Sequence, residues 1–372
     1  MPKIKLINVS KRWGDFVGVD HLNLEIDDRS FITLLGPSGC GKTTTLRMIA
    51  GLETPTEGTI MIGDTVVFDS ETGINLSPAK RDIGFLFQNY ALWPHMTVYK
   101  NITFGLENLK WKKDDIERRA LEVMKLLRIE EFRDRYPAEL SGGQQQRVAI
   151  ARTLAPSPKV LFMDEPLSNL DAKLRADMRT ELKRLHATTD STFVYVTHDQ
   201  LEAMTLATKI CLMKNGVLQQ YDKPLDVYNR PANLFTADFV GNPTMNFIPA
   251  TVSKVNGKDV SLDFLGFKCV YHAEKELNVE KGAEVILGVR PEFLPITKEG
   301  KLQGVAYSTL PAGMETTVKI SLGKDVILSA VQFGSVDYKT DEKINFDIVG
   351  NGIVLFNKKS TDSYCLGSVE IL

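Results

Sequence analysis

The residue types with the clearest chemical meaning lie in the segment Gly36-Pro37-Ser38-Gly39-Cys40-Gly41-Lys42-Thr43-Thr44. An apolar run at 31–35 precedes it, and residues 46–50 follow with helical apolar spacing. A strand, a glycine-rich turn and a helix start in this order predict a phosphate cradle. Its glycines let successive backbone N–H groups point at phosphate oxygens, and the helix N-terminus adds its positive dipole end. We expect Lys42 to reach the β- and γ-phosphates of a nucleotide and the Thr43 hydroxyl to bind Mg²⁺.

Two carboxylates, Asp164 and Glu165, follow the apolar run 160–163. A run that is apolar on both faces is typical of a buried parallel strand. At the carboxyl end of such a strand, Asp164 would orient Mg²⁺, and Glu165 could accept a proton from an attacking water. An acid pair that only begins a helix is the alternative for these two residues alone. The phosphate loop earlier in the chain favours the catalytic interpretation.

A second loop, Leu140-Ser141-Gly142-Gly143-Gln144, opens a helix with a serine and two glycines. Such a helix start is also suited to an anion. A single nucleotide rarely requires two phosphate-binding loops from one chain. We therefore expect the Ser141 loop to face a nucleotide that is bound by a second copy of the protein.

Length and composition exclude several classes of protein. A chain of 372 residues predicts two or three domains. The net charge of −2 does not favour a nucleic-acid groove, and no apolar run approaches the roughly 18–20 residues that span a bilayer. The N-terminus lacks the apolar core of a signal peptide. Four scattered cysteines without metal spacing indicate reduced thiols in a cytosolic protein. Among them, Cys40 is predicted to be a reactive thiolate, with burial under the loop as the alternative.

The pattern of elements changes near residues 241–243. Before that point, helices are expected at 43–50, 114–127, 142–154 and 172–187, and buried strands at 160–163 and 193–197. Beyond it, short alternating strands are expected at 247–255, 260–264, 285–289, 316–322, 326–331 and 353–356, which favours a small barrel or sandwich. We therefore predict an α/β nucleotide domain over 1–240 and an all-β domain over 241–372.

Taken together, these motifs resemble the ATP-binding cassette (ABC) ATPases, whose signature is Leu-Ser-Gly-Gly-Gln. Further matches are Gln88 after the strand 85–87, the run Ser168-Asn169-Leu170-Asp171 after Glu165, and His198 after the strand ending at Thr197. The resemblance implies an α/β P-loop NTPase cassette with a mixed sheet and a helical signature subdomain at about 90–158. It also implies that the all-β domain is an OB-like regulatory barrel.

The resemblance implies ATP and Mg²⁺ as cofactors and assigns a role to individual residues. It places Thr43, Gln88 and Asp164 on Mg²⁺, lets Glu165 polarise the attacking water and brings His198 to the γ-phosphate. The resemblance also counts Lys42 and Gln88 among the catalytic residues. A lone surface histidine is the alternative for His198.

The same resemblance implies further contacts to the nucleotide. Trp13 matches the aromatic side chain that stacks on adenine, with a core tryptophan as the alternative. The remaining cofactor-binding residues of the loop are Gly36, Pro37, Ser38, Gly39, Cys40, Gly41 and Thr44. Ser141, Gly143, Gln144 and Asp171 would complete the site of the opposite subunit in a homodimer.

Residues 88–98 resemble the segment with which importer ATPases meet two membrane permease subunits. Leu92 and Trp93 would be exposed anchors there, unless they belong to the core. The runs 168–175, 241–247 and 288–292 resemble the carbohydrate-importer branch. The resemblance therefore implies a peripheral protein on the cytoplasmic face of the cell membrane. It would contact an external solute-binding protein only indirectly and no nucleic acid.

The predicted function is that of an importer ATPase, with a sugar as the favoured solute. Transport of a polyamine, iron or glycerol phosphate is the alternative. A soluble ABC ATPase acting on ribosomes or DNA is a remote alternative, because the chain has one cassette and no heptad run between Lys42 and Ser141. A cassette that only binds nucleotide is disfavoured by the presence of Lys42, Glu165 and His198.

Overall fold

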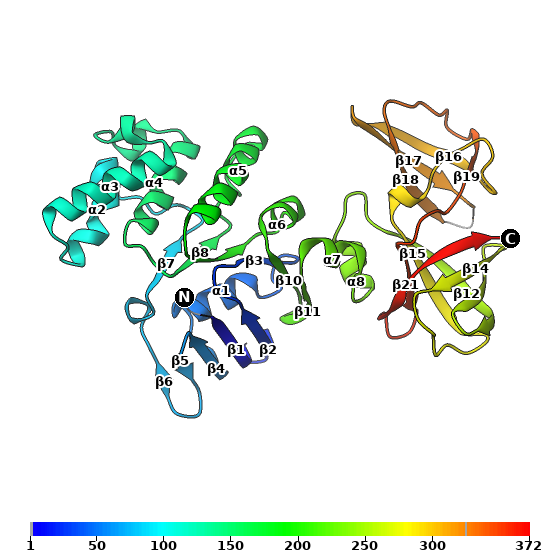
Figure 1. The fold of residues 1–372 in the computed structure, drawn as a ribbon, viewed down its shortest axis with the longest axis horizontal. Coiled ribbons are helices and arrows are strands. Elements are labelled where there is room, and N and C mark those ends of the chain that lie inside the picture. Colours follow the sequence, from blue (N-terminus) through cyan, green and yellow to red (C-terminus); the bar gives the residue numbers. More distant parts are fainter. Residues whose placement is uncertain (1–2, 324–325) are drawn as a thin grey trace. The chain divides into compact units, whose positions relative to one another are not determined.

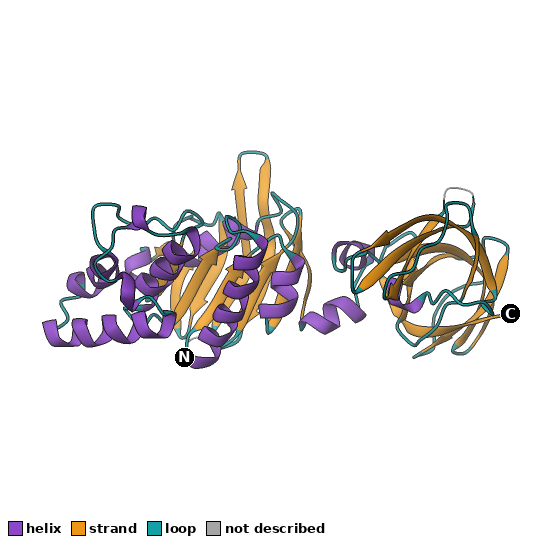
Figure 2. Cartoon of the chain, turned by 90° about the horizontal axis from the view of Figure 1, so that it is seen from above, coloured by secondary structure: helices purple, strands orange, loops and turns teal. Residues whose placement is uncertain are grey.

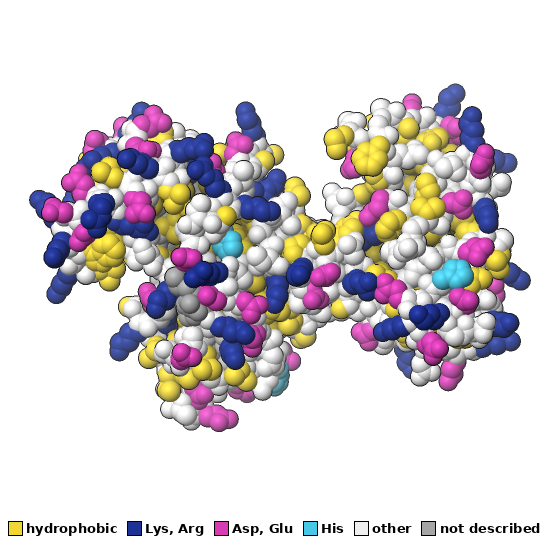
Figure 3. Space-filling view, viewed as in Figure 1, with side chains coloured by type: hydrophobic (Ala, Val, Ile, Leu, Met, Phe, Trp, Pro, Cys, Tyr) yellow, Lys and Arg dark blue, Asp and Glu magenta, His cyan; other side chains and the backbone are white. Residues whose placement is uncertain are grey.

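The chain forms two compact units, Met1–Pro224 and Leu225–Leu372 (Figure 1). The computed structural model describes residues 3–323 and 326–372. On the face of each unit in Figure 3, cationic and anionic side chains are interspersed. The domain boundary that we predict from the sequence lies about sixteen residues after the division between the units.

The centre of the N-terminal unit is a six-stranded sheet in the order β11-β10-β3-β9-β8-β7. Its strands are β3 (Phe31–Leu35), β7 (Ile83–Leu86), β8 (Val160–Asp164), β9 (Thr192–Val196), β10 (Lys209–Lys214) and β11 (Val217–Asp222). All neighbouring pairs are parallel except β10 with β11. The strands predicted at 160–163 and 193–197 are confirmed to within one residue.

Both faces of this sheet are covered, which explains why β8 and β9 are buried along their whole length and mostly apolar. Val160 and Phe162 point into one hydrophobic cluster, whereas Leu161 and Met163 point into another. Side chains alternate along a strand, so Asp164 lies on the same face as Val160 and Phe162. That face also carries helix α1 (Lys42–Ala50), which ends at Gly51 in a left-handed conformation.

A five-stranded antiparallel sheet in the order β2-β1-β4-β5-β6 shares this cluster. Its strands are β1 (Ile4–Trp13), β2 (Phe16–Ile26), β4 (Glu57–Ile62), β5 (Thr65–Asp69) and β6 (Ile74–Asn75). The sequence pattern predicts only short strands at 4–9 and 22–26, whereas β1 and β2 continue to the turn at Gly14-Asp15, where Trp13 pairs with Phe16. Periodicity missed these ends because register shifts between Leu6 and Arg12 interrupt the strict alternation of side chains.

The second face of the central sheet is covered by helices. They are α2 (Val98–Asn108), α3 (Lys113–Leu127), α4 (Gly142–Leu154) and α5 (Ala172–Thr188), followed by the shorter α6 (Gln200–Leu206). Buried residues of the first four helices form one cluster with the side chains that β8 and β9 direct to this second face. The helices predicted at 114–127, 142–154 and 172–187 are confirmed to within one residue, whereas α2 was not expected.

The C-terminal unit is mostly β-structure (Figure 2). Strands β12 (Asn246–Asn256), β13 (Asp259–Phe264), β14 (Phe267–Ala273), β21 (Ser363–Ile371), β20 (Ile353–Asn357) and β15 (Glu284–Val289) close into a barrel in that order. A four-stranded sheet has the order β18 (Ile327–Phe333), β17 (Glu315–Ser321), β16 (Leu302–Pro311) and β19 (Lys343–Phe346). One hydrophobic cluster joins the barrel to this sheet. The predicted fold class, a cassette followed by an all-β barrel domain, is confirmed.

Two short helices, α7 (Pro224–Asn229) and α8 (Leu234–Phe239), are held to the barrel by Arg290. This side chain is 1% exposed and donates hydrogen bonds to the carbonyls of Ala237 and Val240 at 3.1 and 2.5 Å. It also donates to the carbonyl of Tyr228 at 2.7 Å and packs on the Tyr228 ring. Arg290 therefore satisfies backbone groups that the ends of α7 and α8 leave free.

We expect Arg290→Ala to lower the free energy of unfolding of the C-terminal unit by about 2–4 kcal/mol, because three carbonyls lose a charged donor and a cavity forms. Urea unfolding of the full chain measures this, with far-UV circular dichroism following both units. Tryptophan fluorescence is an internal control, since Trp13, Trp93 and Trp111 are the three tryptophans and all lie before residue 225. An unchanged dichroism transition, matching that of the exposed control Lys281→Ala, would contradict the role given to Arg290.

Candidate nucleotide-binding site

The loop between β3 and α1 has the backbone of a phosphate cradle. Gly36, Gly39 and Gly41 have φ values of 149°, 78° and 101°. A Cβ at Gly36 would lie 2.2 Å from the Met213 carbonyl oxygen, and one at Gly41 would lie 2.5 Å from the Gly18 carbonyl oxygen. Glycine is thus required at both positions for conformation and for space.

Lys42 lies inside this loop and is 5% exposed. Its Nζ donates hydrogen bonds to the carbonyls of Gly36 and Pro37 at 2.7 and 2.9 Å. These contacts hold the ammonium group at the centre of the turn. A bound anion would therefore meet a positive charge that is already in position.

Thr43 and Asp164 come together although 121 residues separate them. The Thr43 hydroxyl donates to Asp164 Oδ1 at 3.1 Å, and Arg47 donates to Asp164 Oδ2 at 3.2 Å. Neighbouring ligands of an octahedral Mg²⁺ lie about 3 Å apart, so a hydroxyl and a carboxylate at this separation fit two positions of that ion. Asp164 is 5% exposed, and it reaches Thr43 because it lies on the face of the sheet that carries α1.

Glu165 is the residue at which the chain leaves the sheet, and its φ is +46°. A left-handed conformation is uncommon for a side chain other than glycine, asparagine or aspartate. It directs the carboxylate to Gln88 and His198, with Oε2 at 3.4 Å from both Gln88 Nε2 and His198 Nδ1. Gln88 also donates to the Ser168 hydroxyl at 3.3 Å. The structure thus brings three of the four predicted catalytic side chains together.

Trp13 lies beside the phosphate loop and is 44% exposed. Its ring stacks with that of Phe16 at 6.0 Å between centroids. A pocket of about 370 Å³ is lined by both aromatic rings, the glycine-rich loop and Glu165. A Cβ on Gly18 would lie 2.4 Å from the Trp13 ring, so Gly18 lets the indole lie close against β2. This pocket offers an aromatic platform next to a phosphate cradle.

The signature residues do not line this pocket. Ser141 is the N-cap of α4 and forms a capping box with Gln144, and its side chain is exposed. Gly143 lies against Leu174, whose side chain would contact any Cβ at that position at 2.7 Å. Asp171 caps α5 and is also exposed. These four predicted residues therefore lie apart from the phosphate loop of their own chain.

The segment 88–98 is fixed to the helix that begins with the signature. Arg152, near the end of α4, donates to the carbonyls of Tyr90 and Ala91, both at 2.6 Å, and lies 4.7 Å from the centroid of the Trp93 ring. Leu92 and Trp93 are half-buried, whereas Pro94 and His95 are exposed. Trp93 thus packs in part against Arg152 of its own chain, and the rest of its side chain is accessible.

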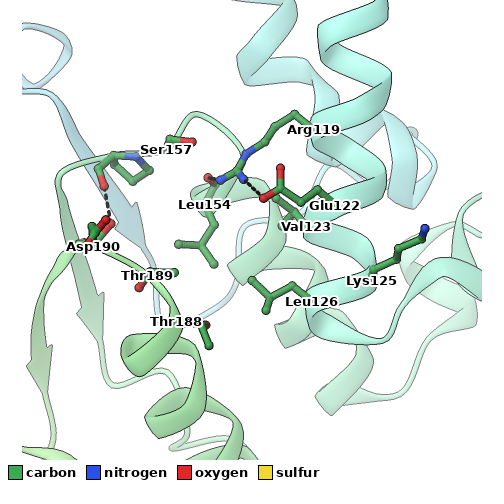
Figure 4. A pocket seen from close by; sticks show the side chains of 12 residues that line it. Arg119, Glu122, Val123, Lys125, Leu126, Leu154, Ser157, Thr188, Thr189 and Asp190 are labelled. Atoms are coloured by element: carbon green, nitrogen blue, oxygen red, sulfur yellow. Dashed lines mark hydrogen bonds and ion pairs between the residues drawn. The ribbon is translucent and has the colours of Figure 1, made fainter.

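A larger pocket of about 530 Å³ lies between α3, the end of α4 and residues 188–191, which connect α5 to β9 (Figure 4). Arg119 in its wall donates to the carbonyls of Leu154 and Ala155 and pairs with Glu122. Arg119 therefore caps the C-terminus of α4. No predicted site residue lines this pocket, and the glycine-rich loop does not contribute to it.

The prediction that Cys40 is a reactive thiolate is wrong. Cys40 is 2% exposed, and burial raises the pKa of its thiol, an effect that the nearby Lys42 ammonium only partly offsets. The alternative, burial under the loop, is what the structure has. All four cysteines are free.

Comparison with known proteins identifies the chain. Residues 19–168 match the ABC transporter family, and residues 241–294 match the MalK OB fold domain. The chain is 50% identical over 299 residues to the trehalose/maltose import ATP-binding protein MalK of Thermococcus litoralis, covering 79% of each chain. The chain belongs to the ABC import ATPases. Its activity is the hydrolysis of ATP to drive import.

Other relatives of this ABC import ATPase differ in what their names describe. It is 44% identical over 328 residues to the maltose/maltodextrin import ATP-binding protein MalK of Salmonella typhimurium, covering 87% of this chain and 86% of the relative. It is equally identical over 340 residues to an osmoprotective compounds uptake ATP-binding protein, GgtA, of Synechocystis, covering 86% and 91%.

Among solved structures, a dimeric post-hydrolysis state of the ATP-binding cassette MJ0796, bound to ADP and phosphate, matches with a TM-score of 0.51 and 35% identity. The match covers 59% of this chain and 98% of that one. Within residues 3–323 and 326–372, we find no helix with the length and hydrophobicity that crossing a membrane requires.

Sequence reasoning missed several side chains at this site. Phe16 and Gly18 belong to no recognised motif, although an aromatic residue on each side of the Gly14-Asp15 turn could have indicated a cross-strand pair. Arg47 lies one helical turn after Thr43, which is the spacing that places two side chains on one face.

We expect Trp13→Ala to weaken ATP binding by about 1–3 kcal/mol, and Phe16→Ala by less, because the base loses a stacking surface. Titration calorimetry with ATP and with inorganic triphosphate separates base binding from phosphate binding. Both variants should leave triphosphate affinity unchanged, as should the control Trp111→Ala, which removes an exposed tryptophan outside the pocket. Equal losses for ATP and triphosphate would show that these rings act on the loop rather than on the base.

Proposed function

We propose that the chain is the ATP-hydrolysing subunit of a sugar importer and works as a homodimer with Mg²⁺. In this proposal residues 1–240 form the nucleotide-binding domain, with a helical subdomain at about 90–158, and residues 241–372 form a regulatory domain. The observation that carries the catalytic part is the cluster of Glu165, Gln88 and His198 next to the loop that holds Lys42.

Hydrolysis begins with the triphosphate on the backbone amides of the glycine-rich loop. Lys42 exchanges its contacts with loop carbonyls for phosphate oxygens. Thr43 and Asp164, with Gln88, would hold Mg²⁺, which neutralises phosphate charge when bound. Glu165 then accepts a proton from the attacking water, and His198 donates a hydrogen bond to the γ-phosphate.

The second nucleotide contact comes from another copy of the chain. Ser141, Gly143, Gln144 and Asp171 are exposed or at helix starts and do not line the pocket of their own chain. The dimeric cassettes among the similar structures support this arrangement. Two such sites form together when the contact closes on a two-fold axis.

Residues 88–98 would contact two membrane permease subunits, which places the protein peripherally on the cytoplasmic face of the cell membrane. Gln88 contacts Glu165, and Arg152 ties Tyr90 and Ala91 to the signature helix. A change at the γ-phosphate would therefore reach the permease contact through the Gln88 segment.

A sugar is the favoured solute because the relatives named above include trehalose, maltose and maltodextrin importers. The osmoprotective compounds of the Synechocystis relative show that identity near 44% does not fix the solute. Polyamine, iron or glycerol-phosphate import is the second candidate.

We expect Glu165→Gln to lower ATP hydrolysis by about 10²–10⁴-fold and to keep ATP binding, because the variant loses the general base but keeps the size of the side chain. Lys42→Ala should instead lose ATP affinity. Calorimetry and phosphate release, measured on the same preparations, separate the two effects. Hydrolysis within a few-fold of the wild type in Glu165→Gln would remove this residue from the base role.

The Glu165→Gln background also tests the shared site. Bound ATP should be retained after free nucleotide is removed by desalting, and adding Ser141→Arg should release it quickly by blocking closure of the dimer. Initial ATP affinity should change little, because Ser141 does not line the pocket of its own chain. Retention that is indifferent to Ser141→Arg would argue against a composite site.

The solute is tested by uptake in cells that lack this ATPase. Restoring the wild-type chain should restore uptake of labelled trehalose or maltose, whereas Glu165→Gln should not. Uptake of putrescine, ferric iron and glycerol phosphate, measured in parallel, should stay unchanged. Restored uptake of one of these three, without the sugars, would replace the sugar assignment.

A further inference from the structure

A buried carboxylate, Glu202, lies behind the site and takes no direct part in the chemistry proposed above. It is 3% exposed and accepts hydrogen bonds at Oε2 from the Tyr195 hydroxyl at 2.7 Å and the Thr197 hydroxyl at 2.6 Å. Burial raises its pKa, which the two hydroxyl donors and the charge of Arg175 oppose. A carboxylate kept this far from water needs a structural or functional reason.

The residues on either side of His198 are held by hydrogen bonds: Thr197 to Glu202, and Asp199 to the start of α6. The Thr197 hydroxyl accepts a hydrogen bond from the Asp199 backbone N–H at 2.9 Å while it donates to Glu202. Asp199 caps α6 by accepting from the N–H groups of Leu201 and Glu202. The backbone is therefore fixed before and after His198, whose own side chain is 60% exposed.

Arg175 connects this arrangement to the loop at 168–171. Its guanidinium donates to the Leu170 carbonyl at 3.0 Å and to Asp199 Oδ2 at 3.5 Å, and its Nε lies 4.0 Å from Glu202 Oε1. The Nε is buried and has no hydrogen-bond partner. A small cavity is bordered by Glu165, Ser168, Arg175, Thr197, His198, Asp199 and Glu202.

We propose that Arg175 and Glu202 are positioning residues for hydrolysis: they hold His198 in place and link it to the loop that ends at Asp171. A single side chain makes this link, because Arg175 contacts both the Leu170 carbonyl, next to Asp171, and Asp199, next to His198. The unpartnered Nε lies 0.5 Å beyond hydrogen-bonding range of Glu202, so a small shift of either residue completes this contact.

The proposal rests on the proposed function, in which His198 meets the γ-phosphate and Asp171 meets the opposite subunit. It adds that these two contacts depend on each other within one chain. A dimer contact at Asp171 that moves Leu170 would move Arg175, and through Asp199 it would change the position of His198. Closure of the dimer would thereby favour the catalytic arrangement of His198.

A double-mutant cycle on the full chain tests this, with ATP hydrolysis and ATP affinity measured for Arg175→Ala, His198→Ala and the double variant. Arg175→Ala should lower kcat about 10–100-fold, as expected for loss of charged hydrogen bonds, and change ATP affinity less than about threefold. The double variant should be no slower than His198→Ala alone. Effects that multiply would overturn the proposal.

Two further measurements keep the test decisive if the single variants are unstable or too slow. Arg175→Lys keeps the charge but lacks the planar fork that reaches Leu170 and Asp199 together, so it should fold and remain slow. Millimolar guanidinium should partly restore the kcat of Arg175→Ala but not that of His198→Ala. Absence of this rescue in a folded Arg175→Ala protein would also count against the proposal.

Arg184→Ala is the matched control, because Arg184 is an exposed arginine on the same helix. It should hydrolyse ATP like the wild type. Glu202→Gln tests the positioning role of Glu202 separately, because it should lower kcat while leaving ATP affinity unchanged. If the wild type itself hydrolyses no ATP, the proposed function fails; if the wild type is active and the cycle is additive, only the positioning role fails.

Discussion

The cassette depends on one constraint, which is that both faces of its parallel sheet are covered. Strands β8 and β9 are then buried along their length and mostly apolar, and the charged side chains of the site lie where the strands end. Asp164 ends β8, and His198 follows β9 by two residues. Because neighbouring parallel strands end at the same edge, these residues meet the loop after β3 there. The same arrangement of parallel strands therefore buries the sheet and brings the site residues together at one edge.

Lys42, Asp164 and Ser141 were predictable because each stands at the junction of a strand or helix with a loop of fixed composition. There the local sequence determines the backbone, and the backbone directs the side chain. Helix α4 was predictable for the same reason, since Ser141 and Gln144 form its capping box within four residues. The fold class followed from the change from helical to alternating periodicity near residue 241.

Other features depend on contacts between distant segments. The sequence around Cys40 does not show that its thiol is buried, because Cys40 packs in a cluster with Cys211 and Met213 of β10, which lie far along the chain. Arg290 and α8 lie some fifty residues apart, so the attachment of 225–240 to the barrel cannot be read from either segment alone. The extended ends of β1 and β2 were missed because irregular pairing between the two strands interrupts the alternation that a sequence pattern can detect.

The missing side chain of Gly18 has a consequence for how related sequences vary. The Trp13 ring occupies the space where a Cβ on residue 18 would lie, at 2.4 Å. A residue larger than glycine at 18 therefore requires either a shift of the half-exposed Trp13 ring or a smaller side chain at 13. In an alignment of relatives, the two positions should covary, and a chain with alanine at 18 should recognise its base with a different surface.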